Sequence, residues 1–217
     1  MRKLISNLSI RAKIMLITTP LTCAIIFSTI VSGIIANRAK NEAETIYYDT
    51  LYAINNNLVS ADRDFYQALV GASQHRELSG EAPVKPEGNP GTDFSAQMKE
   101  KLNDFEENKS QVLNKVKDAA DIASKFDILY NQLKSDSGYT FSQLVNLFNS
   151  GYDEWVALYD VGNGRVDWTS FNDKFNTLRD YLDKMQEITE EFAVIEEEEI
   201  SKSINNQVMA ISIVFGL

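Results

Sequence analysis

The sequence predicts an all-α protein: an antiparallel up-down-up-down four-helix bundle that is continuous with membrane helices. Three observations lead to this class. Apolar residues recur at alternating steps of three and four over most of the chain, which is the period of packed helices. Only four prolines and ten glycines occur in 217 residues, so a turn-rich β fold is disfavoured. A charge-free stretch of 24 residues follows Lys13 and is long enough to cross a bilayer as a helix.

The charge-free stretch, residues 14–37, is expected to be a transmembrane helix. A cleaved signal peptide is the alternative, but its apolar core is usually about 7–15 residues long. Residues 1–37 hold four basic residues and no acid: Arg2, Lys3, Arg11 and Lys13. Because positive charge stays on the cytoplasmic side, residues 1–13 are expected in the cytoplasm and the chain after residue 37 outside it.

The other end of the chain is also apolar. Residues 208–217 form a ten-residue run without a formal charge, which is too short to span a bilayer. We therefore expect these residues to be the start of a truncated second transmembrane helix. Residues 38–207 then form an extracytoplasmic domain, which carries 17 basic and all 31 acidic residues. The expected location of the protein is the cell inner (cytoplasmic) membrane.

Four helices are expected in this domain, over 47–78, 94–133, 139–161 and from 168 onward. A loop at 80–91 holds three of the four prolines, and Thr92 or Asp93 can cap the second helix. The second helix, about 40 residues as predicted, is too long to pair with the third end to end at about 1.5 Å per residue. It must begin lower, break or overhang. Trp155, Trp168, Tyr152 and Tyr159 are expected in the core, because aromatic stripes at this spacing usually pack inside. The alternative is that they floor a ligand site near the turn between the third and fourth helices.

Composition excludes several functions. The net charge of −10 disfavours a nucleic-acid partner. One cysteine and one histidine exclude a disulfide framework and the usual Cys/His zinc sites. No set of residues resembles a catalytic constellation. We therefore expect no enzyme, no cofactor and no metal; His75 is expected in the core rather than at a metal or pH-sensing site.

The layout resembles that of a known family. MRKLISNLSIRAKIML leads into a span, a helical domain of roughly 170 residues and a second span, and FNSGYDEWVALYDVGNGRVDWTSF (148–171) is similar to the third-helix, top-turn and fourth-helix region of that family. The family is the bacterial methyl-accepting chemotaxis receptors, and the chain resembles their sensory half. The resemblance implies a homodimer with the first helices at the interface, a small-molecule ligand and helix displacement into the second span. It also implies contact with membrane lipid and cytoplasmic signalling partners reached through a further C-terminal part.

Two alternatives stay open at this point. The same kind of sensor is found on histidine kinases and cyclases. A membrane-anchored helical structural or interaction protein is the other possibility, with the acidic bundle as a spacer or docking surface.

The resemblance implies a ligand near the membrane-distal end, held in aspartate-type receptors by clustered arginines on the first helix. This chain has only Arg63 and Arg76 there, thirteen residues apart. A polar patch at helical spacing on the first helix and polar residues of the fourth supply the candidate ligand-binding set: Arg63, Tyr66, Gln67, Asn172, Asn176 and Arg179. The expected ligand is a small molecule such as a carboxylate or an amino acid, since arginine can clamp a carboxylate with two hydrogen bonds. The alternatives are that Arg63 pairs with Asp62 or Asp64, and that the asparagines are ordinary exposed positions.

Overall fold

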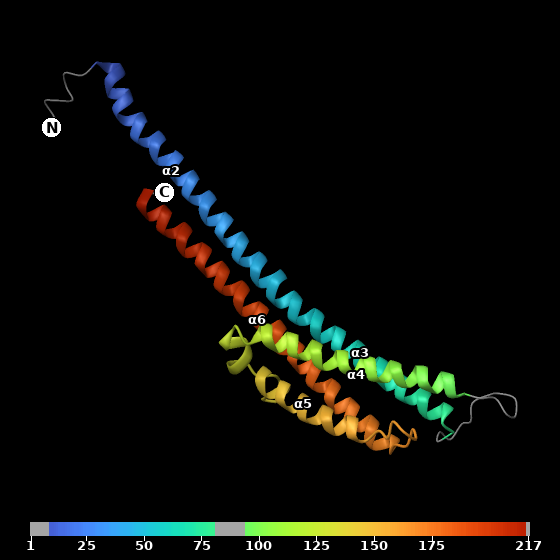
Figure 1. The fold of residues 1–217 in the computed structure, drawn as a ribbon. Helices are drawn as coiled ribbons and strands as arrows, with labels where there is room; N and C mark the ends of the chain where they lie inside the picture. The colour runs from blue at the N-terminus through green and yellow to red at the C-terminus, as the bar shows by residue number, and fades with distance from the viewer. Residues whose placement is uncertain (1–8, 81–93, 216–217) are drawn as a thin grey trace. The chain divides into compact units, whose positions relative to one another are not determined.

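The all-α class is confirmed. A computed structural model describes residues 9–80 and 94–215, with side chains up to residue 210. The structure is 87% helical and contains no strand within the described residues. The chain divides into two compact units (Figure 1): a terminal unit of residues 1–46 and 195–217, and a helical unit of residues 47–194. The domain boundaries predicted at 37 and 207 stay predictions.

Helix α2, Ile10–Glu44, contains the predicted span. Ser9 caps its start by accepting a hydrogen bond from the Ala12 amide at 3.3 Å. The hydroxyls of Thr18, Thr22 and Thr29 donate to the carbonyls four residues back, at 2.9–3.0 Å, which satisfies these three hydroxyls without water. The helical run Ile10–Leu78 is long and apolar enough to cross a membrane. No residue in its 18-residue stretch of highest mean hydropathy is buried.

The helical backbone continues from α2 through a π-helical segment, η1 (Thr45–Tyr52), into α3 (Ala53–Leu78). The apolar spacing predicts a seam along this segment: Tyr47, Leu51, Ile54, Leu58, Ala61, Phe65, Ala68, Ala72 and His75. All are buried except Tyr47, which is 37% exposed, and the predicted end at Leu78 is confirmed. The π segment was not predicted from the sequence. The predicted loop at 80–91, apart from Gly80, and the predicted caps Thr92 and Asp93 lie outside the described residues.

Helix α4 is Ser95–Ala123, shorter than the predicted 94–133. Just after its end the backbone takes the tighter 3₁₀ hydrogen-bonding pattern: the amides of Lys125 and Phe126 donate to carbonyls three residues back. A short π segment, η2 (Ile128–Gln132), follows and buries Leu129. Of the three possibilities for the overlong helix, the structure therefore selects the break.

Helix α5 is Phe141–Ala157, slightly shorter than the predicted 139–161. Thr140 and Gln143 form a reciprocal capping box at its start: the Thr140 hydroxyl accepts from the Gln143 amide, and the Gln143 side chain accepts from the Thr140 amide. The preceding turn contains Gly138 at φ +83°, a conformation that other residues rarely adopt. Helix α6, Trp168–Phe215, begins at the predicted residue.

Within the helical unit, α4, α5 and the first part of α6 each run opposite to the helix before (Figure 1). Phe65 of α3 lies at the centre of their shared core. Its ring centre is 4.8 Å from that of Trp155 in α5 and 4.4 Å from that of Phe175 in α6. Phe105 brings α4 to the same cluster, 5.8 Å from Trp155. Aromatic rings from all four helices therefore meet in one place.

Candidate functional site

The predicted ligand-binding residues lie on neighbouring turns of α3 and α6, and their arginines already have partners. Arg63 donates from Nε and Nη2 to Oδ1 of Asp64, at 2.9 and 2.7 Å. The Asp64 side chain is only 1% exposed. Its second oxygen, Oδ2, finds no hydrogen-bond partner within the described residues. Arg63 thus compensates a buried carboxylate, which is one of the alternatives that the sequence left open.

Arg179 of α6 pairs with Asp62 of α3 in a two-pronged ion pair. Its Nε lies 2.5 Å from Oδ1 and its Nη2 lies 2.8 Å from Oδ2. The hydrogen bonds to Asp62 raise the pKa of Arg179. Nearby, burial and then the charge of Asp62 raise the pKa of Asp183. A ligand carboxylate at Arg179 would have to displace an intramolecular one.

The other predicted residues are mostly exposed. The ring of Tyr66 lies 6.4 Å from Phe175, with more than half of the side chain open to solvent. Gln67 and Asn176 are exposed, and Asn172 is half-buried. The structure therefore brings Tyr66 and Arg179 together around Phe175, but both predicted arginines are occupied by carboxylates of the chain.

A different positive site forms where the loop between α5 and α6 meets the end of α3. Asp160 orders this loop: its side chain accepts from the Gly162 amide at 3.0 Å and from the Asn163 side chain at 2.9 Å. The hydrogen bond from Asn163 is the main cause of the lowered pKa of Asp160. Gly164 has φ +66°, and a Cβ there would come within 2.5 Å of the Ser79 hydroxyl. Only glycine allows the loop to approach α3 this closely.

A buried hydrogen-bond chain fixes the same junction from inside. The Tyr159 hydroxyl donates to the Ala72 carbonyl at 3.0 Å, and His75 Nδ1 lies 2.7 Å from the same hydroxyl. Since the hydroxyl has one proton, His75 Nδ1 carries a hydrogen and donates it to Tyr159. Burial lowers the pKa of His75 and raises the pKa of Tyr159, so both groups stay neutral at pH 7. His75 belongs to the core, as predicted.

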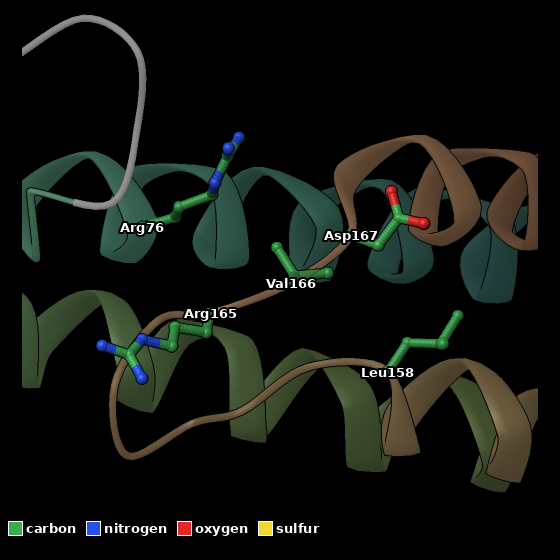
Figure 2. A pocket seen from close by; sticks show the side chains of 5 residues that line it. All are labelled: Arg76, Leu158, Arg165, Val166 and Asp167. Carbon is green, nitrogen blue, oxygen red and sulfur yellow. The ribbon is translucent and has the colours of Figure 1, made fainter.

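An open pocket of about 450 Å³ lies at this junction (Figure 2). Its lining consists of Arg76 from α3 and of Leu158, Arg165, Val166 and Asp167 from the loop. The Arg76 guanidinium also lies 5.3 Å from the centre of the Trp168 ring. Two guanidinium groups and one carboxylate give the lining a net positive charge.

The single carboxylate of this lining is already engaged. Asp167 caps α6: its Oδ2 accepts from the Ser170 hydroxyl at 2.6 Å and its Oδ1 from the Thr169 amide at 3.2 Å. The hydrogen bond from Ser170 is the main cause of the lowered pKa of Asp167. Asp167 therefore makes its hydrogen bonds within the helix cap. The positive charge of the lining comes from Arg76 and Arg165 and favours an anion.

None of the residues that line this pocket belongs to the ligand-binding set predicted from the sequence. The spacing of Gly162, Gly164 and Arg165 after Asp160 was the available signal. This spacing indicates a tight loop with an arginine on it. It does not indicate which helix lies next to that arginine.

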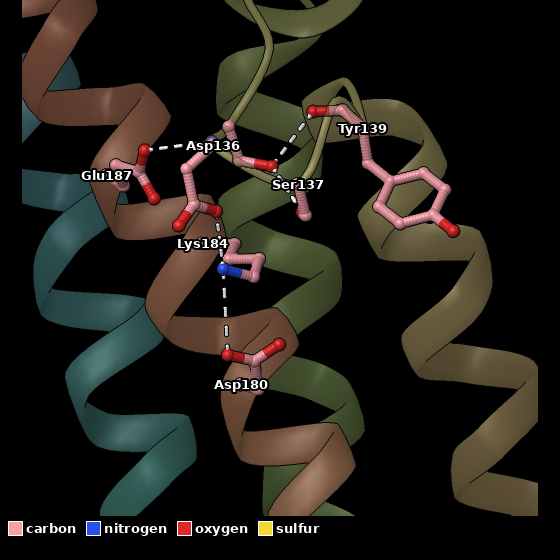
Figure 3. A network of polar contacts seen from close by, with 7 residues as sticks. Asp136, Ser137, Tyr139, Asp180, Lys184 and Glu187 are labelled. Atoms are coloured by element: carbon pink, nitrogen blue, oxygen red, sulfur yellow. Dashed lines mark hydrogen bonds and ion pairs between the residues drawn. The ribbon is translucent and has the colours of Figure 1, made fainter.

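Polar contacts also tie α6 to the turn between η2 and α5 (Figure 3). Lys184 Nζ lies 2.6 Å from Asp136 Oδ1, and the Asp136 amide donates to Glu187 at 3.0 Å. The hydrogen bond from Lys184 is the main cause of the lowered pKa of Asp136. Nearer the start of α6, Lys174 pairs with Glu154 of α5. Together with Arg179–Asp62, these pairs hold α6 to α3, to α5 and to the turn before α5.

Comparisons with models of known protein families, with curated proteins and with solved structures found no match for this chain.

Proposed function

We propose that this protein is a membrane-anchored sensor of a small anionic solute and the input half of a chemotaxis-type receptor. The observation that carries the proposal is the pocket lined by Arg76 and Arg165. Guanidinium groups favour carboxylates and other planar anions, because their N–H groups match two acceptor oxygens. Leu158 and Val166 supply apolar lining of the kind that small-molecule sites use.

The proposed location is the inner membrane, with residues 38–207 outside the cytoplasm. The apolar window within Ile10–Leu78 supports the anchor. The orientation rests on the four basic residues before Ile14, which favour a cytoplasmic N-terminus.

An exposed apolar stripe along η1 and α3 supports a homodimer. Steps of four and seven separate its residues, so they share one face of a helix: Tyr48, Tyr52, Val59, Tyr66 and Val70. Each is between 36% and 70% exposed in the single chain. Packing against the same stripe of a second copy would remove this surface from water. The first helices would then form the interface.

Signalling would proceed by displacement of α6. An anion that contacts both Arg76 and Arg165 would attract α3 and the loop that leads directly into α6 toward each other. It can shift α6 only if it binds one arrangement of these elements more tightly than the other. The ion pairs of Lys174, Arg179 and Lys184 define the resting position that such a shift must change.

Anion binding to the whole chain in lipid nanodiscs tests the proposal. The probe is succinate, with neutral succinamide as the comparison, measured by isothermal titration calorimetry. We expect saturable succinate binding that Arg76→Gln weakens about 10- to 100-fold, the equivalent of one charge-assisted hydrogen-bonding group.

Arg63→Gln is the matched control, because Arg63 is paired with Asp64 and does not line the pocket. It should leave succinate binding within about twofold, a change of less than about 0.5 kcal/mol. Binding that is lost in Arg63→Gln but kept in Arg76→Gln would favour the site predicted from the sequence. Equal binding of succinamide and succinate would contradict anion recognition.

A further inference from the structure

We propose that a second pocket, between the start of α3 and α6, binds a small organic ammonium ion. This pocket has a volume of about 220 Å³ and lies entirely within the helical unit. Its first wall is Tyr47, Leu51, Tyr52 and Asn55, and its second wall is Gln186, Thr189, Glu190 and Ala193 of α6. The inference goes beyond the proposed function, and it requires that the proposed dimer interface, which also contains Tyr52, leave this pocket open.

The π segment creates the aromatic wall. In an α-helix, side chains five residues apart point in directions that differ by about 140°. In a π-helix each residue is hydrogen-bonded to the one five positions along the chain, so that such side chains lie closer to the same side. Tyr47 and Tyr52 lie within η1 and are five apart, so their side chains come to one side and line the same pocket. Such segments are often found at functional sites.

The opposite wall supplies the carboxylate of Glu190, which pairs with no cation among the described residues. Glu190 is exposed and makes no ion pair or hydrogen bond with the described residues. The two stretches that flank the pocket, 47–61 and 185–194, contain four acidic residues and no basic one. Glu190 is the one formally charged residue in the lining, which favours a cationic ligand and disfavours an anion.

The donor set indicates an organic cation rather than a metal ion. No group of three metal-ligating acidic, histidine or cysteine side chains occurs in the part of the chain that the structure describes. Aromatic faces and one carboxylate are instead the groups that hold alkylammonium ions, through cation–π attraction and charge pairing. Asn55 and Gln186 have side chains without hydrogen-bond partners in the described residues, and their carbonyl oxygens can accept from a protonated amine.

Titration of the whole chain in neutral-lipid nanodiscs with tetramethylammonium chloride tests the site. Calorimetry gives the affinity, and saturation transfer from aromatic protons to the ligand methyl groups reports contact with the rings. We expect saturable binding, with transfer, that Glu190→Gln weakens by about threefold or more, while Glu191→Gln leaves it unchanged. Glu191 is exposed on the same helix but does not line the pocket.

A second pair of variants, at Tyr52, separates the contribution of the aromatic ring to binding from that of its hydroxyl. Tyr52→Leu should weaken tetramethylammonium binding about 3- to 30-fold, whereas Tyr52→Phe should keep it, because cation–π attraction needs the ring and not the hydroxyl. The proposal is overturned if Glu190→Gln titrates like the unmodified chain, or if uncharged neopentyl alcohol binds equally well. It is also overturned if no saturation occurs, as when a second copy of the chain covers the pocket.

Discussion

Replacing Trp155 with alanine is expected to destabilise the helical unit by about 3–5 kcal/mol, the range found for large aromatic truncations in cores. Trp155 is fully buried. Its ring stacks on Phe171 at 4.6 Å and meets Phe65 edge-on at 4.8 Å. The cavity would open where α3, α5 and α6 meet. In thermal unfolding followed by circular dichroism, Tm should fall by about 6–20 °C, since each kcal/mol corresponds to about 2–4 °C at this size.

Trp155→Phe is the matched control for this prediction. The indole N–H of Trp155 has no hydrogen-bond partner within the described residues. Phenylalanine removes that unsatisfied donor, which offsets about 1–3 kcal/mol of the lost packing. The loss should therefore be within about 1 kcal/mol of zero. A phenylalanine variant as unstable as the alanine variant would contradict the account of this core.

The second large effect is expected at Gly71, where the backbones of α3 and α4 lie close together. A Cβ on Gly71 would lie 3.0 Å from the Phe105 amide nitrogen and 3.2 Å from the Lys101 carbonyl oxygen. Both are backbone atoms, so the helices must separate to admit a methyl group. Overpacking of this kind costs about 1–3 kcal/mol, against a gain of about 1 kcal/mol from removing glycine from a helix. Gly71→Ala should therefore lower stability by up to about 2 kcal/mol.

Gly151→Ala distinguishes this effect from a general cost of crowding. A Cβ on Gly151 would meet side-chain atoms of Leu178 and Lys174, which can change rotamer. The gain in helix propensity then dominates, and stability should stay equal or rise by up to about 1 kcal/mol. Equal Tm losses in the two variants would contradict a backbone contact at Gly71.

The helices could be predicted from the sequence because their apolar periodicity is strong. The seam on α3, the end at Leu78 and the start at Trp168 follow from spacing and composition alone. The break after Ala123 could not be placed, because no glycine or proline marks it and the tightened turn is stabilised by burial of Leu129. The π segment η1 has no signal in the apolar spacing at all.

The candidate site was harder to predict for a related reason. Helical spacing identifies residues on one helix face, but not the carboxylates that pair with them. For Arg63 the sequence left two possibilities, a ligand group or a pair with Asp62 or Asp64, and the structure pairs it with Asp64. The pair between Arg179 and Asp62 of another helix has no signal in the spacing. The Arg76–Arg165 pocket depends on a loop folding back onto α3, and its sequence distance from Arg76 hides that contact.

The central claim is that an anion at the Arg76–Arg165 pocket moves α6 against its neighbours. Paired spin labels at Lys117 of α4 and Glu191 of α6, both exposed, measure this directly in nanodiscs. Cys23 is first replaced by serine, and excess unlabelled chain keeps labelled copies apart. A second pair, Lys117 and Asn56 of α3, serves as the control, because neither residue lies on α6.

Distances by double electron–electron resonance are compared with and without succinate, with calorimetry confirming saturation in the same sample. The account predicts that succinate shifts the mean Lys117–Glu191 distance by about 1–2 Å, the usual size of interface helix shifts, and leaves Lys117–Asn56 unchanged. An unchanged Lys117–Glu191 distance at saturating succinate would contradict transmission through α6.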